Sequence, residues 1–426
     1  MVRVPFPSQF AVWLSLTLCA SASAVYAAGN VSPLGKAPNW SALDQYQETI
    51  THDEFSRLLK NVYCTRGISD ALIRLEPGVA KILTDKDEQT WFTLRFAPDQ
   101  ASLKPVPHPW KPAASLPRAS FFRELSGVHI AIDPGHIGGK WARMEERWFQ
   151  VGDSKPIQEG DMTLLVAKIL VPKLEALGAK VSLVRAKAEP VTSKRPADLR
   201  EEARNILRRA GLAQPRDDFL GPADLEKDQT VRWQSEILFY RISEIRERAE
   251  LVNSRRPDLV LCLHFNAEAW NDPTKPTLID RNHLHLLVNG SYLPPELEFD
   301  DVRFEMLQRL LSRTHEGEIG LAEKLAEAMA RRTQLPPYEY TTENVTKLNP
   351  NGYIYARNLI ATRLYHAPVV YLEPYVMNCE DVFWRVQEGD YKGIRNVNGT
   401  NRPSIYQEYA DGVVDGLIEY YGAARK

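Results

Sequence analysis

Three apolar segments of the chain end beside a side chain that can bind a metal ion or accept a proton: 128–133 before His136, 259–263 before His264, and 368–372 before Glu373. A fourth such residue, Glu159, stands just before a helical pattern that begins near residue 161. Two imidazoles and one carboxylate are the protein ligands of many catalytic zinc sites, which leave the fourth position to water. The four residues therefore form a candidate zinc site.

Each of these residues is weak evidence when taken alone. A histidine near a strand end is more often structural than functional. Glu159 by itself would serve as an acidic residue that complements the dipole of a helix N-terminus. Glu373 is the hardest to explain without a function, because an acid that follows an apolar strand is costly to bury without a partner. Only the combination indicates a site.

Three other residues could also bind a metal. His283 and His285 share one strand face by their spacing of two, but no nearby carboxylate in the sequence completes a ligand set, so we interpret them as structural. Cys262 shares a strand face with His264. A fourth protein ligand would close the site to water, which disfavours Cys262 in a catalytic centre.

A sheet that gathers several strand ends at one edge is needed to bring these side chains together. Strand patterns alternate with helical patterns beyond residue 126. This predicts an α/β fold, with a mostly parallel mixed sheet flanked by helices on both faces. Open sheets of this kind place their sites at the carboxyl ends of the strands. The expected strands are 128–133, 180–185, 258–266, 284–289 and 369–375, and the expected helices are 162–177, 237–254 and 319–333.

Two residues mark the course of the helix at 162–177. Pro172 lies inside the pattern and predicts a kink or the start of a second helix, because proline removes a backbone donor. Gly178 follows the last apolar position, where a helix cap is expected.

The remaining sequence divides around this core. Residues 28–100 are predicted to form a small α+β domain of unknown role, with a helix at 53–60 and strands at 80–83 and 91–96. A proline-rich linker covers 101–125. The catalytic domain is predicted over 126–426, with two long polar insertions at 186–235 and 291–318. We expect at least one insertion to border the substrate groove, since long insertions are usually functional or mobile.

The N-terminal segment 1–27 has the order of a secretory signal. Arg3 precedes an apolar run at 10–18, and small residues fill 20–28. The run is too short for a stable membrane anchor, which needs about 20 apolar residues. Lipidation of Cys19 has little support, because Leu18 precedes it where a small residue is preferred. The protein is therefore expected to be exported to the periplasm or the cell wall.

Composition excludes several classes of partner. The 426 residues contain 53 Lys+Arg and 55 Asp+Glu, for a net charge of -2. This balance argues against a nucleic-acid binder and against a polybasic membrane-surface protein. Beyond the signal, Cys64, Cys262 and Cys379 form an odd set, for which buried free thiols are favoured and one disulfide stays open.

Four sequence blocks resemble, in order, the zinc-dependent N-acetylmuramoyl-L-alanine amidases of the type-3 family, which cut peptidoglycan: 128–136, 158–185, 247–267 and 358–381. The resemblance extends from about residue 128 to residue 422, and the order of the blocks makes it specific. Ile137 departs from the glycine usual in the family, and Pro374-Tyr375 replaces a typical Gly-Phe pair. Residues 41–100 match no accessory domain that we can name.

The resemblance implies a site and a reaction. His136, Glu159 and His264 would bind one zinc ion per chain, and Glu373 would be the general base. Zinc lowers the pKa of its bound water to roughly 7 and polarises the scissile carbonyl. Glu373 would take the water proton and pass it to the leaving amine. The substrate would be peptidoglycan, cut between N-acetylmuramic acid and L-alanine.

Two other functions stay open at this point. The same ligands would serve an exported zinc peptidase or amidohydrolase that acts on a different amide. A non-catalytic wall-binding protein with a decayed site is disfavoured, because both histidines and both glutamates are retained. The sequence leaves open the glycan and stem-peptide preference, the oligomeric state, and any regulatory partner at the insertions.

Overall fold

The computed structural model describes residues 30–221, 223–270 and 277–425. The predicted export signal at 1–27 lies outside these ranges. Within the described part of the chain, no helix is both long and apolar enough to cross a membrane.

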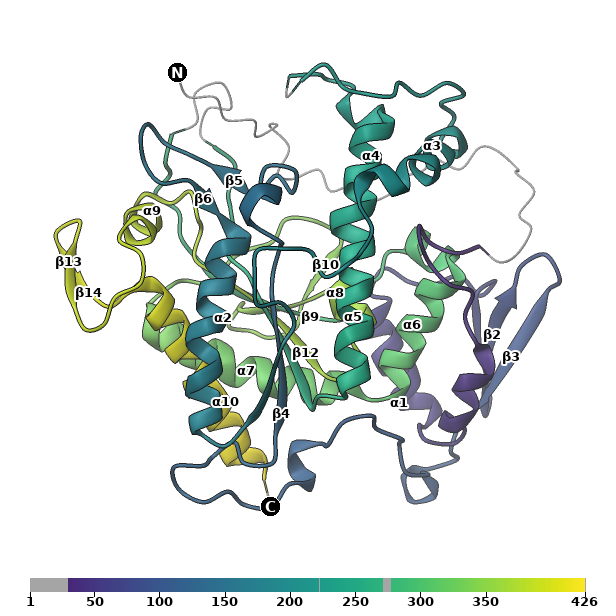
Figure 1. The fold of residues 1–426 in the computed structure, drawn as a ribbon. Helices are drawn as coiled ribbons and strands as arrows, with labels where there is room; N and C mark the ends of the chain where they lie inside the picture. The colour runs from purple at the N-terminus through teal and green to yellow at the C-terminus, as the bar shows by residue number, and fades with distance from the viewer. Residues whose placement is uncertain (1–29, 222, 271–276, 426) are drawn as a thin grey trace.

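A seven-stranded sheet forms the centre of the molecule (Figure 1). Its strands, in spatial order, are β10 (Val345–Lys347), β11 (Ile354–Arg357), β9 (Leu284–Val288), β12 (Val369–Pro374), β8 (Leu259–Leu263), β4 (His129–Pro134) and β7 (Lys180–Leu183). β12, β8, β4 and β7 are parallel to one another, whereas β9 is antiparallel to β12 and β10 is antiparallel to β11. The predicted mostly parallel mixed sheet is confirmed.

Helices cover both faces of this sheet, as predicted. Ile130 and Ile132 of β4 pack on one face, while Ala131 between them packs on the other, because side chains alternate along a strand. The first face is covered by α2 (Glu159–Ala176), α7 (Thr314–Thr333) and α10 (Ile405–Ala424), and the second by α5 (Glu244–Arg255) and α8 (Ile360–Leu364). The C-terminal helix α10 was not anticipated from the sequence, although it packs against both α2 and α7.

Helix α2 continues through Pro172 as one element. The expectation of a second helix at this point is therefore wrong. Leu170 and Leu174, on either side of the proline, are fully buried in the main core. Their burial offsets the cost of a proline inside a helix, which is about 3 kcal/mol. Gly178 has the left-handed φ of 90° and donates its N–H to the Glu175 carbonyl, as expected for a helix cap.

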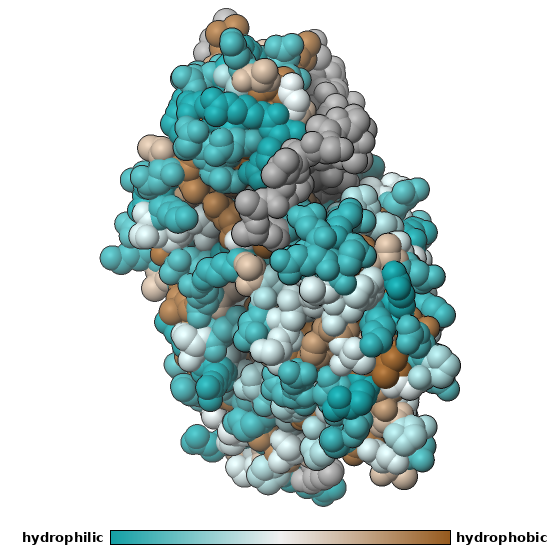
Figure 2. All heavy atoms as spheres, turned by 90° about the vertical axis from the view of Figure 1, so that its right-hand side faces the viewer, coloured by the Kyte–Doolittle hydropathy of each residue, from teal (hydrophilic) through white to brown (hydrophobic). Residues whose placement is uncertain are grey.

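The first predicted insertion, 186–235, forms a helical protrusion. It contains α3 (Arg200–Arg209) and α4 (Val231–Ile237), and α4 continues through η8 (Leu238–Ser243) into α5. The protrusion has its own small core, in which Leu199 and Ala203 pack with Phe239. It stands at the top of the molecule in Figure 1, and Figure 2 shows that its outer surface is mostly hydrophilic. The polar sequence of this segment therefore reflects a small solvated subdomain.

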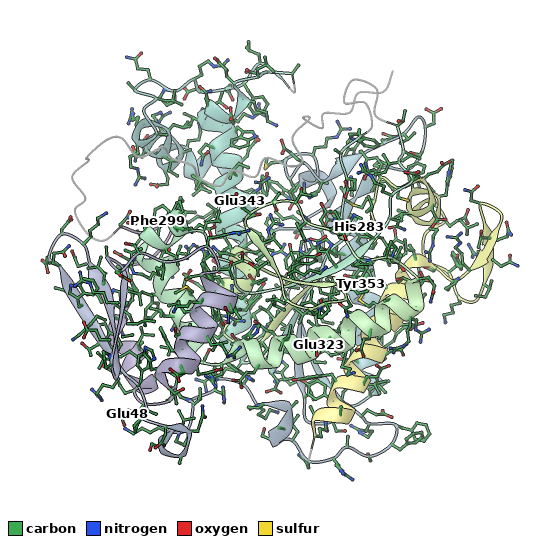
Figure 3. All side chains as sticks on the ribbon, turned by 180° about the vertical axis from the view of Figure 1, so that it is seen from behind. Glu48, His283, Phe299, Glu323, Glu343 and Tyr353 are labelled. Carbon is green, nitrogen blue, oxygen red and sulfur yellow. The ribbon has the colours of Figure 1, made fainter. Side chains whose placement is uncertain are left out.

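The second predicted insertion, 291–318, is largely a buried helix. Its main element is α6 (Asp300–Leu311), and α7 begins at Thr314, five residues before the expected start. Met306, Leu307 and Leu310 are fully buried in one hydrophobic cluster with residues of the N-terminal unit. Figure 3 shows Glu48 on that unit and Phe299 at the start of α6. The expectation of a long polar insertion therefore does not describe this segment, because α6 completes the core of the N-terminal unit.

The N-terminal unit combines α1 (His52–Leu58) with a three-stranded antiparallel sheet of β1 (Ile73–Glu76), β2 (Val79–Asp85) and β3 (Thr90–Arg95). Most of the charged residues of α6 are buried, so the polar sequence of this helix did not indicate that it belongs to a core. Arg303 is fully buried, donates to the Leu83 carbonyl at 2.8 Å and pairs with Asp300 at 2.6 Å. Such groups are tolerated inside a protein when they are paired and hydrogen-bonded. The domain boundaries at 28–100, 101–125 and 126–426 stay proposals.

Cys64, Cys262 and Cys379 are free and buried. The preferred interpretation of the three described cysteines as buried thiols is confirmed.

Candidate metal centre

The chain turns sharply after β4 and brings His136 over the sheet edge. Gly135 in this turn lies so close to His264 that a Cβ atom there would be 2.1 Å from the Cε1 atom of the imidazole. Only glycine fits such an approach. His136 itself has a φ of 57°, in the left-handed region, which residues other than glycine rarely adopt. The surrounding structure must therefore hold the backbone in this conformation.

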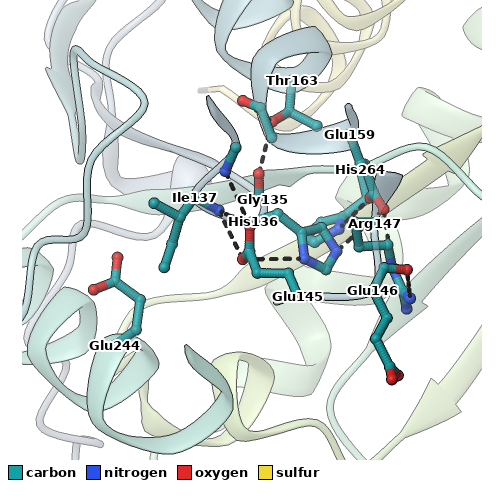
Figure 4. A network of polar contacts seen from close by, with 12 residues as sticks. Gly135, His136, Ile137, Glu145, Glu146, Arg147, Glu159, Thr163, Glu244 and His264 are labelled. Atoms are coloured by element: carbon teal, nitrogen blue, oxygen red, sulfur yellow. Dashed lines mark hydrogen bonds and ion pairs between the residues drawn. The ribbon is translucent and has the colours of Figure 1, made fainter. Parts of the chain in front are cut away.

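Glu159 is the first residue of α2, and its side chain is almost completely buried. Its Oε1 lies 3.0 Å from Nδ1 of His264 and accepts a hydrogen bond from the Phe265 N–H at 3.2 Å. Its Oε2 lies 3.2 Å from Nε2 of His136 (Figure 4). The carboxylate therefore lies between the two imidazoles.

The structure brings the three predicted zinc ligands together from three separate segments. The ligand atoms of His136, Glu159 and His264 all lie within 4.8 Å of one another. Cys262 is buried on β8 and is not a member of this group. Two imidazoles and one carboxylate converging on one point fit a catalytic zinc, and no fourth protein ligand among the described residues closes the site.

Electrostatics within the cluster favour a bound cation. Burial acts to raise the pKa of Glu159, but the interactions with His136 and His264 outweigh it and hold this pKa well below its ordinary value. Burial also acts to lower the pKa of His136, but the carboxylates of Glu159 and Glu145 raise it overall. Burial lowers the pKa of His264 to about 4, so this imidazole is neutral near pH 7 and free to act as a ligand.

Two further residues support the cluster, and the sequence analysis missed both. The Glu145 carboxylate accepts hydrogen bonds from the backbone N–H groups of Ile137 and Gly138, and its Oε1 lies 3.5 Å from Nδ1 of His136. The Nε atom of Arg147 lies 3.1 Å from Oε2 of Glu159. Neither residue belongs to a strand end or a recognisable spacing, so no sequence signal pointed to them.

Glu145 lies beside His136, where its carboxylate would orient this histidine on a bound metal. We predict that Glu145→Gln weakens zinc binding by about tenfold or more, because outer carboxylates fix the orientation and basicity of the imidazole. Glu146→Gln is a matched control, since the Glu146 carboxylate pairs instead with Lys227 at 2.6 Å. Competition titration with a chelator measures both affinities. Equal affinities in the two variants would contradict the assigned role of Glu145.

Glu373 lies beside this cluster on β12. The parallel register pairs Leu372 with Leu263, so Glu373 and His264 both follow a paired position at neighbouring strand ends. Burial is the main cause that raises the pKa of Glu373 well above its ordinary value, and the charge of Glu159 adds to it. Arg147 and Arg357 oppose this shift. The structure places Glu373 in the same cavity as the three candidate ligands.

This cavity has a volume of about 280 Å³. Its walls beyond the four predicted residues come from η8, α5, β9, β11 and the loop before β10, and include Tyr240, Arg241, Ile245, His285, Leu287, Tyr338, Tyr340 and Arg357. Among the described residues, none from 186–235 or 291–318 lines it. The expectation that an insertion borders the groove is therefore wrong for the cavity itself. The protrusion packs on η8, and η8 supplies Tyr240 and Arg241 to the cavity wall.

The histidine pair at 283 and 285 differs from expectation. His283 has a carboxylate partner after all, since its Nε2 lies 3.0 Å from Oε1 of Glu268. The sequence could not reveal this pair, because Glu268 follows a different strand. The two histidines are not members of the group formed by His136, Glu159 and His264. His285, however, lines the cavity next to Glu373.

The two departures from the family pattern have structural explanations. Ile137 is fully buried against the core of the protrusion, which includes Phe239. Tyr375 has a φ of 64°, and its hydroxyl donates to Glu408 on α10 at 2.5 Å. Ile137 fills space that the usual glycine would leave empty, and the Tyr375 hydroxyl makes a contact that the usual phenylalanine could not provide.

Comparison with known proteins identifies the relatives of this chain. The model of the N-acetylmuramoyl-L-alanine amidase family matches residues 130–395, which include all four predicted functional residues. No curated protein sequence matches. Similar solved structures include the N-acetylmuramyl-L-alanine amidase Ami1 from Mycobacterium smegmatis, with 17% identity, 70% of this chain and 99% of that chain covered, and a TM-score of 0.38.

Two further structures are similar to a comparable degree. The amidase AmiC2 of Nostoc punctiforme has 15% identity, with 69% of this chain and 98% of that chain covered, and a TM-score of 0.35. The CwlD amidase from Clostridioides difficile, solved in complex with the GerS lipoprotein, has 14% identity and a TM-score of 0.37, with 70% of this chain and 100% of that chain covered. With such low identities and TM-scores, the assignment rests on the family match instead.

Proposed function

This chain belongs to the N-acetylmuramoyl-L-alanine amidase family, and we propose that it cuts peptidoglycan with one zinc ion held by His136, Glu159 and His264. The family match covers more than half of the chain and agrees with the resemblance of the four sequence blocks. The observation that carries the zinc proposal is the convergence of the three side chains within 4.8 Å. The bond cleaved is the amide between the lactyl group of N-acetylmuramic acid and L-alanine.

The residues of this chain have distinct parts in the proposed reaction. Zinc, when bound, lowers the pKa of a coordinated water to roughly 7 and polarises the scissile carbonyl. Glu373 would accept a proton from the attacking water as the water oxygen bonds to the carbonyl carbon. The bond from this carbon to nitrogen then breaks, and Glu373 passes the proton to the nitrogen that leaves. The products are a lactyl carboxylate and a peptide with a free L-alanine amine.

The charges around Glu373 support both proton transfers, the first from the water and the second to the leaving nitrogen. A carboxylate with an ordinary pKa near 4.3 is a weak base at neutral pH. Burial and the neighbouring Glu159 raise the pKa of Glu373, which strengthens it as a base and lets it return the proton as an acid. Arg147 and Arg357 oppose the rise and favour the ionised form that the first step requires.

Product analysis tests the scissile bond. We expect mass spectrometry of digested sacculi to find free peptides that begin with L-alanine, together with intact glycan strands. Release of peptides cut at another amide would instead support a zinc peptidase or a different amidohydrolase. Binding to sacculi without any release would support a wall-binding protein with an inactive site.

The place of action follows from the substrate. Peptidoglycan lies outside the cytoplasmic membrane, so we propose export to the periplasm or cell wall, with residues 1–27 as a cleaved signal. N-terminal sequencing of the protein recovered from the cell envelope should begin near residue 28. An uncleaved protein retained in the cytoplasm would contradict export.

A further inference from the structure

A buried histidine lies directly opposite Glu373 in the sheet. The antiparallel register of β9 and β12 pairs His285 with Glu373, and Figure 1 shows the two strands side by side. Directly opposed residues point to the same face, with Cβ atoms about 4.5–5.5 Å apart. Both side chains line the active-site cavity, and His285 is only 1% exposed.

Only one ring nitrogen of His285 has a hydrogen-bond partner. Its Nε2 lies 2.8 Å from the hydroxyl of Tyr340. Its Nδ1 is buried and has no partner among the described residues. A buried polar atom without a partner is costly, so this nitrogen is available to a group on the same side of the sheet that can turn toward it.

The partners of Tyr340 determine which nitrogen of His285 carries the proton. Arg357 makes a side-chain hydrogen bond to Tyr340, and a guanidinium can only donate. The tyrosine oxygen therefore accepts from Arg357, while its O–H donates to Nε2 of His285. Burial lowers the pKa of His285 well below its ordinary value, so the imidazole is neutral. A neutral imidazole that accepts at Nε2 carries its hydrogen on Nδ1.

The direction of the ring places this N–H toward β12. Tyr340 packs against Tyr355 of β11, with ring centroids 5.0 Å apart, so Nε2 of His285 points toward the β11 side of β9. The two nitrogens of an imidazole point in widely different directions, because one carbon atom separates them in the five-membered ring. Nδ1–H therefore faces the β12 side, where Glu373 lies.

We infer that His285 is a positioning residue for the reaction, and that its Nδ1–H orients the Glu373 carboxylate. The inference rests on the proposed role of Glu373 as the base. Arg357, Tyr340 and His285 then form a chain of donors that ends at this carboxylate. A hydrogen bond to the ionised form of a carboxylate lowers its pKa. The chain thus acts against the effect of burial and favours the ionised form of Glu373.

Other charged and titratable groups also act on Glu373, and the variants at position 285 do not replace them. They are Glu159 at the start of α2, Arg147 before β5 (Trp148–Phe149), His264 after β8, Arg357 on β11, Tyr371 on β12, Tyr340 before β10 and Tyr409 on α10. Variants at position 285 change none of these groups, so a shift in the pH profile reports the lost donor.

Two substitutions at position 285 separate the two ring nitrogens. Asparagine places an amide N–H near the position of Nδ1 but cannot reach Tyr340, whereas glutamine reaches toward Tyr340 but lacks the donor near Glu373. We expect His285→Gln to lower kcat about tenfold with little change in KM. The acidic limb of the pH–activity profile of this variant should move up by about one pH unit, which is the size expected for losing a hydrogen bond to a charged group. His285→Asn should recover at least part of the lost kcat and shift the limb less.

Tyr340→Phe provides a second test that leaves position 285 unchanged. It keeps the aromatic ring but removes the hydroxyl that fixes the tautomer, so it should move the acidic limb in the same direction by a smaller amount. Zinc content and the thermal midpoint are measured for each variant to verify the fold.

The outcomes distinguish this inference from the proposed function. An unchanged acidic limb in folded His285→Gln and Tyr340→Phe would overturn the role of His285, as would equal losses in the asparagine and glutamine variants. If His285→Gln does not fold, Tyr340→Phe alone decides. A wild-type protein that releases no L-alanine peptides would instead overturn the proposed function.

Discussion

Glu373→Gln is expected to retain its zinc and its fold and to lose roughly 100-fold or more in kcat, which is the effect of removing a positioned general base. Glutamine has nearly the same shape as glutamate but cannot accept the water proton. Because Glu373 lies beside the three candidate ligands and is not among them, zinc content should stay at one per chain. Binding to sacculi should also be retained, since the substitution leaves the cavity walls intact.

The matched control for this variant is Glu380→Gln. Glu380 is exposed and lies at the start of α9 (Glu380–Gln387), so its loss removes one negative charge without touching the cavity. Its kcat should remain close to that of the wild type. Loss of zinc along with activity in Glu373→Gln would make Glu373 a ligand, and near-normal turnover would remove the proposed mechanism.

Removal of either candidate histidine ligand is expected to have an effect at least as large. His136→Ala and His264→Ala each delete one of three ligands, and two remaining ligands hold zinc poorly. The metal supplies several kcal/mol of charge stabilisation in the transition state, so we expect activity to fall roughly a thousandfold. Elemental analysis after dialysis measures the metal, and the amidase assay measures its consequence.

Two controls accompany the histidine variants. His108→Ala changes an exposed histidine outside the cavity and should keep both zinc and activity. Treating the wild type with a chelator should abolish activity, and added zinc should restore it. Full zinc retention in His136→Ala or His264→Ala would exclude that residue from the ligand set.

Local patterns in the sequence predicted the main elements and the four central residues of the site. β4 and β8 appear as apolar runs because they are buried on both faces, and such strands are easy to recognise. The carboxyl ends of parallel strands meet at one edge, so His136 and His264 could be placed together before any coordinates were known. The order of the four blocks then indicated the family, and the family match confirmed it.

Predictions from local sequence patterns were wrong for segments whose role depends on contacts with residues far along the chain. The helix α6 looked like a polar insertion because Asp300, Arg303 and Arg309 carry charges. In the folded chain these charges are paired inside the protein, and the apolar face of α6 completes the core of the N-terminal unit. Pairing of this kind depends on residues far along the chain, and hydropathy does not report it.

The sequence by itself determined which residues could do chemistry, because their types and their positions after apolar strands are local properties. Only the tertiary structure decided how they are supported. Glu145 reaches His136 through the fold of a turn, and His285 lies opposite Glu373 because β9 is antiparallel to β12. Strand order and register are set by the packing of the whole sheet, so these contacts depend on every strand at once and leave no periodicity in the sequence.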